Sequence, residues 1–180
     1  MTELVTALMG IFIFTGVAMG PADLEAKAVS APSYTVSMTG YNAVPGQTDS
    51  DPFTTASGAY SDPDVVAARS RDLAEELPFG TVIAIEPTDT SSPGCGYPAV
   101  ADQVGLRVVA DTMNARFTKK IDILFHNKMD DGRNPAKVFG KCEGVHVRVV
   151  GKIDVNKMPK NQSELALAVG LYTAKYAVAK

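Results

Sequence analysis

The sequence contains no tryptophan, only two histidines and only two cysteines among its 180 residues. Aromatic residues make up 7% of the chain, which offers little surface on which nucleic-acid bases would stack. The formal net charge is −3, and no stretch of the chain forms a basic stripe. Because nucleic-acid-binding domains usually carry a basic surface, we expect no nucleic-acid partner.

The two cysteines, Cys95 and Cys142, lie outside any CxxC motif and away from a histidine at ligand spacing. We therefore expect no metal site. An even pair in an exported protein is typical of one disulfide, and two unpaired small residues are the alternative.

The N-terminus carries the one long apolar run, Leu4–Gly20, which has 17 residues without a charge. It is long for the apolar region of a signal peptide and slightly short for a membrane span. A small-x-small site follows at Ala26-Lys27-Ala28. We expect export, to the cell envelope or the exterior. Residues 1–28 serve either as a cleaved signal peptide or as an N-terminal membrane anchor, and residues 29–33 form a linker.

Glycine and proline are plentiful, at 15 and 11 residues, and this turn-rich composition favours a β-dominated domain. The β-branched and alternating segments predict six short strands and a compact, mainly β barrel over residues 34–151. No internal repeat is present. The predicted strands are Tyr34–Ala43, Val65–Ala68, Thr81–Glu86, Leu106–Ala110, Ile121–Phe125 and Val145–Val150.

Two helices are expected. Pro135–Phe139 is short, with proline tolerated in its first turn and Gly140 placed to end it. After a polar linker, Ser163 is expected to cap a last helix, Glu164–Ala179, within residues 152–180. This helix is apolar on nearly all sides, so it must pack against the barrel, a partner or a membrane surface.

Two aspartates, Asp111 and Asp122, stand at the end of one predicted strand and near the start of the next. If these strands pair as a hairpin about residues 114–119, the two carboxylates share one face. Mutual repulsion and partial desolvation would then raise the pKa of one, as a general acid for glycosidic cleavage requires. Turn capping is the alternative role. The same register pairs Val109 with Leu124 and Arg107 with His126.

The stretch "VVADTMNARFTKKIDILF", with Asp-Thr and then Ile-Asp eleven positions on, resembles the 3D domain, a family named for its three aspartates. The resemblance covers about residues 34–150 and rests on several short motifs in the family's order. The others are "TTASG" (Thr54–Gly58), "VVAA" (Val65–Ala68), "LPFGT" (Leu77–Thr81), "AKVFG" (Ala136–Gly140) and "VHVRV".

The family implies a six-stranded double-psi β-barrel, related to membrane-bound lytic transglycosylase A and to stationary-phase cell-wall proteins. It implies cleavage of the MurNAc–GlcNAc bond of peptidoglycan glycan strands, with a 1,6-anhydro product and neither metal nor organic cofactor. Asp122 matches the catalytic acid/base and Asp111 the acid that shares its cleft. We expect the enzyme to be a monomer.

The chain departs from the family pattern in two respects. Met113-Asn114 and Thr118 stand where the family often has glycines, and their bulk would narrow or reshape the cleft. The first acid is displaced, because Arg69 follows the "VVAA" strand, and only Asp72 remains as a third catalytic candidate. Thr55, Ser57 and Arg116 are expected to bind substrate, with Arg116 steering an acidic group. Loop packing is the alternative role of Thr55 and Ser57, and a solvated surface side chain is the alternative for Arg116.

Two further functions remain open. The missing glycines favour a non-catalytic barrel that binds cell-wall glycan. The apolar C-terminal helix favours an envelope interaction module that docks through it.

Overall fold

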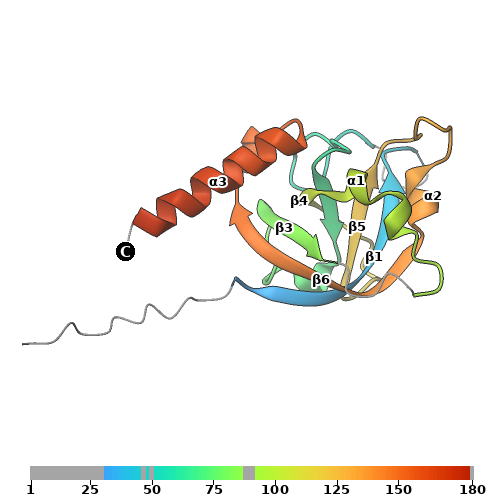
Figure 1. The fold of residues 1–180 in the computed structure, drawn as a ribbon, viewed down its shortest axis with the longest axis horizontal. Coiled ribbons are helices and arrows are strands. Elements are labelled where there is room, and N and C mark those ends of the chain that lie inside the picture. The colour runs from blue at the N-terminus through green and yellow to red at the C-terminus, as the bar shows by residue number, and fades with distance from the viewer. Residues whose placement is uncertain (1–30, 46–47, 49–50, 87–91, 179–180) are drawn as a thin grey trace, which may run out of the picture. The chain divides into compact units, whose positions relative to one another are not determined.

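The computed structural model of the protein describes residues 31–45, 48, 51–86 and 92–178. Its six strands close into a barrel (Figure 1), which confirms the predicted mainly β class. The strands are β1 (Ser33–Asn42), β2 (Val66–Arg69), β3 (Thr81–Glu86), β4 (Leu106–Thr112), β5 (Lys120–Phe125) and β6 (Lys141–Lys152). β3 has the predicted bounds, whereas β6 begins four residues before Val145, directly after Gly140.

The barrel order is β1-β5-β2-β4-β3-β6. Two neighbouring pairs are parallel, β1 with β5 and β2 with β4, and the other pairs are antiparallel. Parallel neighbours cannot be joined by a tight turn, so the chain must cross between distant strands. Strands consecutive in sequence are therefore often not neighbours in this barrel.

Within the described residues, three α-helices accompany the strands: α1 (Ala101–Val104), α2 (Pro135–Phe139) and α3 (Gln162–Val178). Single 3-10 turns lie at Arg71–Leu73, Tyr97–Ala99 and Val155–Lys157. The prediction for α2 is confirmed: the Asn134 side chain accepts a hydrogen bond from the Lys137 backbone N–H, and Gly140 ends the helix at a φ of 64°. Positive φ favours glycine there because it has no Cβ.

The predicted cap of the last helix is wrong by two residues. The Asn161 side-chain oxygen, not that of Ser163, accepts a hydrogen bond from the Glu164 backbone N–H at 2.9 Å. Glu164 in turn accepts from the Lys160 backbone N–H. Asn and Ser are almost equally good caps, so the local sequence does not distinguish the two positions. Leu165 is buried and anchors the first turn of α3 on the barrel.

Two apolar clusters use alternate residues of the central strands. Ala67, Val109 and Ile123 belong to the larger cluster. Their neighbours Ala68, Val108 and Leu124 belong to the smaller one, which also contains Tyr41 and Leu165. Because side chains alternate across a strand, the two clusters lie on opposite faces of these strands. Polar side chains replace the smaller cluster at one end, where the candidate site lies.

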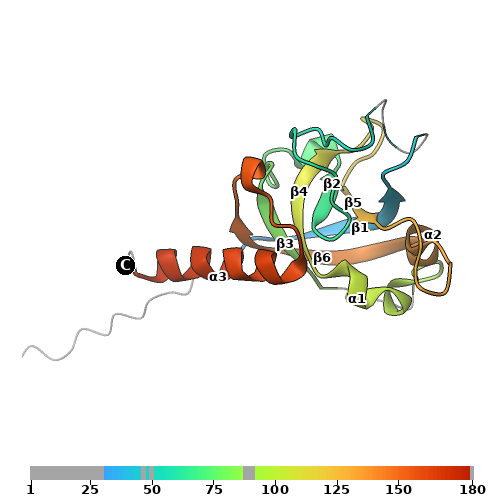
Figure 2. The same ribbon diagram turned by 90° about the horizontal axis from the view of Figure 1, so that it is seen from above.

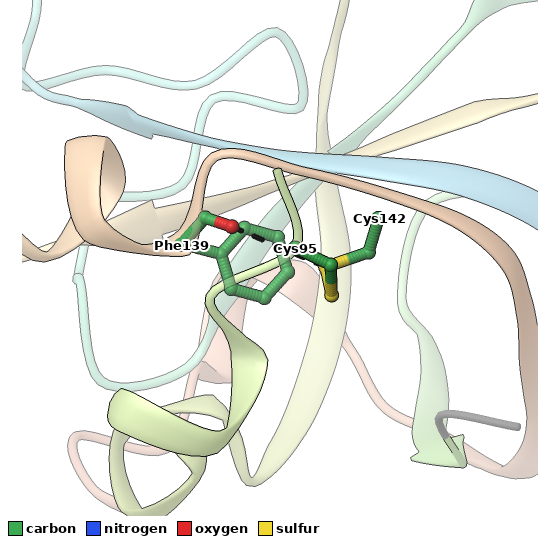
Figure 3. The surroundings of a disulfide bond; sticks show 3 residues. All are labelled: Cys95, Phe139 and Cys142. Carbon is green, nitrogen blue, oxygen red and sulfur yellow. Dashed lines mark hydrogen bonds between the residues drawn. A yellow bond between two sulfur atoms is a disulfide. The ribbon is translucent and has the colours of Figure 1, made fainter. Parts of the chain in front are cut away.

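A disulfide joins Cys95 to Cys142 across 47 residues of sequence (Figure 3). Cys142 is buried at the start of β6, and its sulfur lies 4.0 Å from the carbonyl oxygen of Phe139. The Phe139 ring is buried beside it, 5.5 Å from the centroid of the Phe125 ring. The bond therefore ties the segment before α1 to the aromatic cluster beside α2.

The apolar N-terminal run, predicted to be a signal peptide or an anchor, lies outside the described residues. Among the residues that are described, no helix has both the length and the apolar character needed to cross a membrane.

Candidate functional site

Four side chains form one row across adjacent strands. Thr39 of β1 is paired with Asp122 of β5, Asp122 with Ala68 of β2, and Ala68 with Asp111 of β4. Residues paired across neighbouring strands point to the same face of a sheet. The two aspartates thus share a face, with only the methyl group of Ala68 between them.

The predicted route to this arrangement is wrong. β4 and β5 do not pair as a hairpin, because β2 lies between them (Figure 2). The expected pairs Val109–Leu124 and Arg107–His126 are therefore absent from the paired register of the described strands. His126 contacts the carboxylate of Asp64, and its Nε2 lies 2.8 Å from the nearer oxygen.

A β-bulge in β4 brings Asp111 to the shared face. Ala67 is paired with Val109, but Ala68 is paired with Asp111, so Ala110 is an extra residue. In a regular register Ala110 would be paired with Ala68 and Asp111 with Arg69, and Asp111 would point to the opposite face from Asp122. The Ala110 carbonyl, which the bulge frees from regular pairing, accepts a hydrogen bond from the Ser57 backbone N–H at 3.1 Å.

Among the acids of the described residues, Asp122 has the largest shift in pKa. Burial raises the pKa of its carboxyl to about 6, against the opposing effects of the Thr39 hydrogen bond and the nearby Lys120. The Thr39 hydroxyl donates to Asp122 Oδ1 at 2.7 Å. Asp111 raises the same pKa, but least of these causes. The predicted direction is therefore found, and of the two predicted causes desolvation is the larger and repulsion by Asp111 the smaller.

Asp111 is held by three donors. Its Oδ1 accepts hydrogen bonds from the backbone N–H groups of Ala56 at 2.9 Å and Thr112 at 2.8 Å. Its Oδ2 accepts from the Tyr41 hydroxyl at 3.1 Å. Donors on both oxygens fix the orientation of the carboxylate relative to Asp122.

Tyr41 and Thr39 are functional candidates that the sequence did not single out. They lie two residues apart on β1 and so point to the same face as the aspartates. Burial, followed by the charges of Asp111 and Asp122, raises the pKa of the Tyr41 hydroxyl well above its usual value. Tyr41 therefore remains a proton donor to Asp111. The only sequence signal was a polar face within an otherwise apolar strand.

The row opens into a cleft of about 490 Å³, within the size range of small-molecule sites. Asp111, Asp122 and Tyr41 line it, and so do Arg71 and Arg116. Met113 and Asn114 also line it, as expected if their bulk shapes the cleft. Thr118 is exposed and is not part of the lining.

The other predicted site residues are placed differently. Arg116 lines the cleft, but Asp72, Thr55 and Ser57 do not. The Asp72 carboxylate accepts a hydrogen bond from the Lys119 backbone N–H at 2.8 Å, so it supports the β4–β5 connection. Thr55 is buried, and its hydroxyl contacts the Ser57 hydroxyl and the Ala59 carbonyl, each at 3.0 Å. These two residues shape the loop whose Ala56 N–H holds Asp111.

The raised pKa of Asp122 makes a prediction about stability. Its folded value of about 6 lies above the ordinary 3.8, so the folded protein holds this proton more tightly than the unfolded chain. The resulting stabilisation is complete below about pH 4 and is lost as the pH rises through about 6. Asp122→Asn cannot ionise, so we expect it to be more stable than wild type at pH 8 by up to about 3 kcal/mol, with a much smaller difference at pH 4.

Urea unfolding of both proteins at pH 4 and pH 8 measures this difference. Asp72→Asn is the matched control, and its effect on stability should have the opposite sign. Hydrogen bonds, first that from the Ser70 side chain, lower the pKa of Asp72. That variant should lose stability at pH 8. An Asp122→Asn effect that does not change with pH would contradict the interpretation.

The described residues contain no group of three or more His, Cys, Asp or Glu side chains placed to hold a metal ion. Every buried side-chain nitrogen or oxygen in the described part of the chain has a hydrogen-bond partner.

Comparisons with known proteins add no family to this description. No family model matches the chain, and no curated protein matches its sequence. The candidate site is therefore defined by its own geometry, in which Asp122 and Asp111 share one cleft.

Proposed function

We propose that the protein cleaves peptidoglycan glycan strands as a lytic transglycosylase, with Asp122 as general acid and base. One observation carries the proposal. The carboxyl of Asp122, with a pKa of about 6, lies in a cleft that it shares with the carboxylate of Asp111, and the single strand β2 separates their strands. A carboxylic acid that retains its proton near neutral pH can protonate the oxygen of a leaving sugar.

We further propose that the barrel is the double-psi barrel of the 3D family. The closed order β1-β5-β2-β4-β3-β6 supports this, because two parallel pairs need crossing connections. The sequence motifs of Thr54–Gly58, Asp111–Thr112 and Ile121–Asp122 all meet at the cleft or in the loop beside it. The alternative, a barrel that binds cell-wall glycan without cleaving it, uses the same cleft.

In the proposed reaction, Asp122 donates its proton to the glycosidic oxygen as the C1–O bond breaks. The Asp122 carboxylate then accepts the proton of the C6 hydroxyl, whose oxygen closes on C1 to form the 1,6-anhydro ring. Asp122 thus regains its proton, and no water is consumed. Asp111, held by three donors, places negative charge beside the positive charge that develops at the sugar.

The proposed site of action is the cell envelope or the exterior. The Cys95–Cys142 disulfide supports export, because disulfides persist mainly in oxidising compartments. The chain's apolar N-terminal run supports the same proposal.

We expect activity to fall as the pH rises above about 6. The general acid must carry its proton, and Asp122 loses it with a pKa of about 6. The limiting slope should be about tenfold in kcat/KM per pH unit, measured from initial rates between pH 5 and pH 9. A rate that stays constant across this range would contradict the assignment of Asp122 as the acid.

Digestion of purified sacculi, followed by mass analysis of the released sugars, tests the proposal directly. A 1,6-anhydro end supports a transglycosylase, whereas a reducing end indicates a hydrolase. Binding to insoluble peptidoglycan without any soluble product would support the binding barrel instead.

A further inference from the structure

The six arginines of the chain divide into two groups, and the structure describes all six. Arg69 and Arg107 are buried and donate to backbone carbonyl oxygens. Arg133 and Arg148 are exposed and form ion pairs with Asp131 and Glu86. These four side chains are engaged in holding the fold or the surface together.

Arg71 and Arg116 are different. Both are exposed, both line the cleft, and neither takes part in an ion pair within the described part of the chain. Among the described residues, the two exposed arginines without an ion pair are thus the two that line the cleft.

Both arginines are positioned by neighbouring structure. Arg71 begins the 3-10 turn after β2 and also borders a second hollow, which shares Asp111 and Thr112 with the cleft. Arg116 lies in the connection from β4 to β5, with its guanidinium carbon 4.8 Å from the centroid of the Phe117 ring. The Lys120 ammonium lies 4.6 Å from the same centroid. Arg71 and Arg116 therefore supply the positive charge of the cleft lining, whose acids are Asp51, Asp111 and Asp122.

We propose that Arg71 and Arg116 bind a carboxylate carried by the glycan, next to the bond that is cleaved; this inference rests on the proposed function. A guanidinium binds a carboxylate through two parallel hydrogen bonds. Asp111 repels an anion from the row of acids. The carboxylate of the glycan is therefore held at Arg71 and Arg116, while an uncharged glycosidic oxygen faces Asp122.

This arrangement selects one bond of the repeating strand. In peptidoglycan, only every second sugar carries a lactyl ether, which ends in a carboxylate or is extended by a peptide that has its own carboxylates. Holding that substituent at Arg71 and Arg116 fixes the register of the strand. The bond at C1 of the substituted sugar then lies at Asp122, and the bond at C1 of the unsubstituted sugar does not.

Binding to three glycans of equal length tests the inference. They are strands freed of peptide, strands that retain their peptides, and neutral oligomers of N-acetylglucosamine. Dissociation constants are measured in the Asp122→Asn background, so that no cleavage interferes. The variants are Arg71→Gln with Arg116→Gln, the same pair changed to Lys, and Arg133→Gln as a matched control outside the cleft.

We expect the double Gln variant to bind a carboxylate-bearing strand about 10- to 100-fold more weakly, because hydrogen bonds to charged groups are lost. Its affinity for the neutral oligomer should not change. The double Lys variant keeps both positive charges, but an ammonium cannot make the two parallel hydrogen bonds of a guanidinium. Its loss of affinity for carboxylate-bearing strands should therefore be intermediate. Arg133→Gln should bind every glycan as the background protein does. The strand that shows the loss identifies the carboxylate as that of the sugar or of the peptide.

Equal losses on neutral and carboxylate-bearing glycans would overturn the inference, and so would no loss on any glycan. Unfolding midpoints of all variants establish that they are folded. Digestion of the same strands by the proteins with Asp122 intact separates the two proposals. Anhydro ends formed equally well with and without the arginines would leave the transglycosylase and remove the carboxylate site. A loss of affinity confined to carboxylate-bearing strands, with no product from any protein, would keep the carboxylate site and remove the transglycosylase.

Discussion

Asp122→Asn is expected to lower the release of anhydro-muropeptides from sacculi by about 10²- to 10⁴-fold, the usual contribution of a positioned general acid and base. An amide retains the shape of the carboxyl and accepts a hydrogen bond from Thr39, but it cannot supply a proton to the leaving sugar. Because the same change removes a carboxyl that is costly to ionise in the fold, the variant should be inactive while more stable than wild type at pH 8. Initial rates of product release, measured by mass analysis, give the comparison.

Asp72→Asn is the matched control for this experiment. Asp72 is also an aspartate of the proposed trio, but its carboxylate binds the Lys119 backbone N–H and lies outside the cleft lining. We expect this variant to retain most of the activity. Product release by Asp122→Asn at the wild-type rate would remove Asp122 from the mechanism. A complete loss of activity in Asp72→Asn would make Asp72 a third catalytic acid.

The disulfide is expected to have the largest effect on stability. Replacing Cys95 and Cys142 together by Ala frees a loop of 47 residues in the unfolded chain, which corresponds to about 4 kcal/mol of chain entropy at 25 °C. The effect should appear in urea unfolding as a lower midpoint at a similar slope.

Reductant provides the control for the disulfide experiment. It should destabilise the wild type to about the level of the double Ala variant, and it should leave that variant unchanged. If the oxidised wild type and the double variant unfold at the same urea concentration, the bond does not stabilise this fold. Activity at low temperature should survive, because neither cysteine lines the cleft.

Much of the secondary structure could be predicted from local pattern. The β-branched run of β3 and the Pro135…Gly140 boundaries of α2 identified these elements with their observed bounds. Local propensity acts within a few residues, so such elements can be recognised without knowledge of their neighbours. The cap of α3 was missed because Asn161 and Ser163 are alternatives of nearly equal energy.

Strand pairing depends on residues that are distant in the sequence, and local pattern could not supply it. The four buried residues of β2 lie between β4 and β5, which would otherwise form a hairpin. The extra residue Ala110 then reverses the face of Asp111. The predicted hairpin is wrong and the bulge was not predicted, but each places Asp111 on the same face as Asp122. The two omissions therefore cancel.

The sequence by itself determined which residues are candidates for the chemistry: it marked Asp111, Asp122 and Arg116, as well as the positions of most strands and the pair of cysteines. Only the tertiary structure decided how these residues are arranged. It placed Tyr41 and Thr39 beside the acids, moved Asp72, Thr55 and Ser57 out of the cleft lining, and added Arg71 to it. The physical reason is that burial, more than repulsion, raises the pKa of Asp122, and burial depends on neighbouring strands that are distant in the sequence.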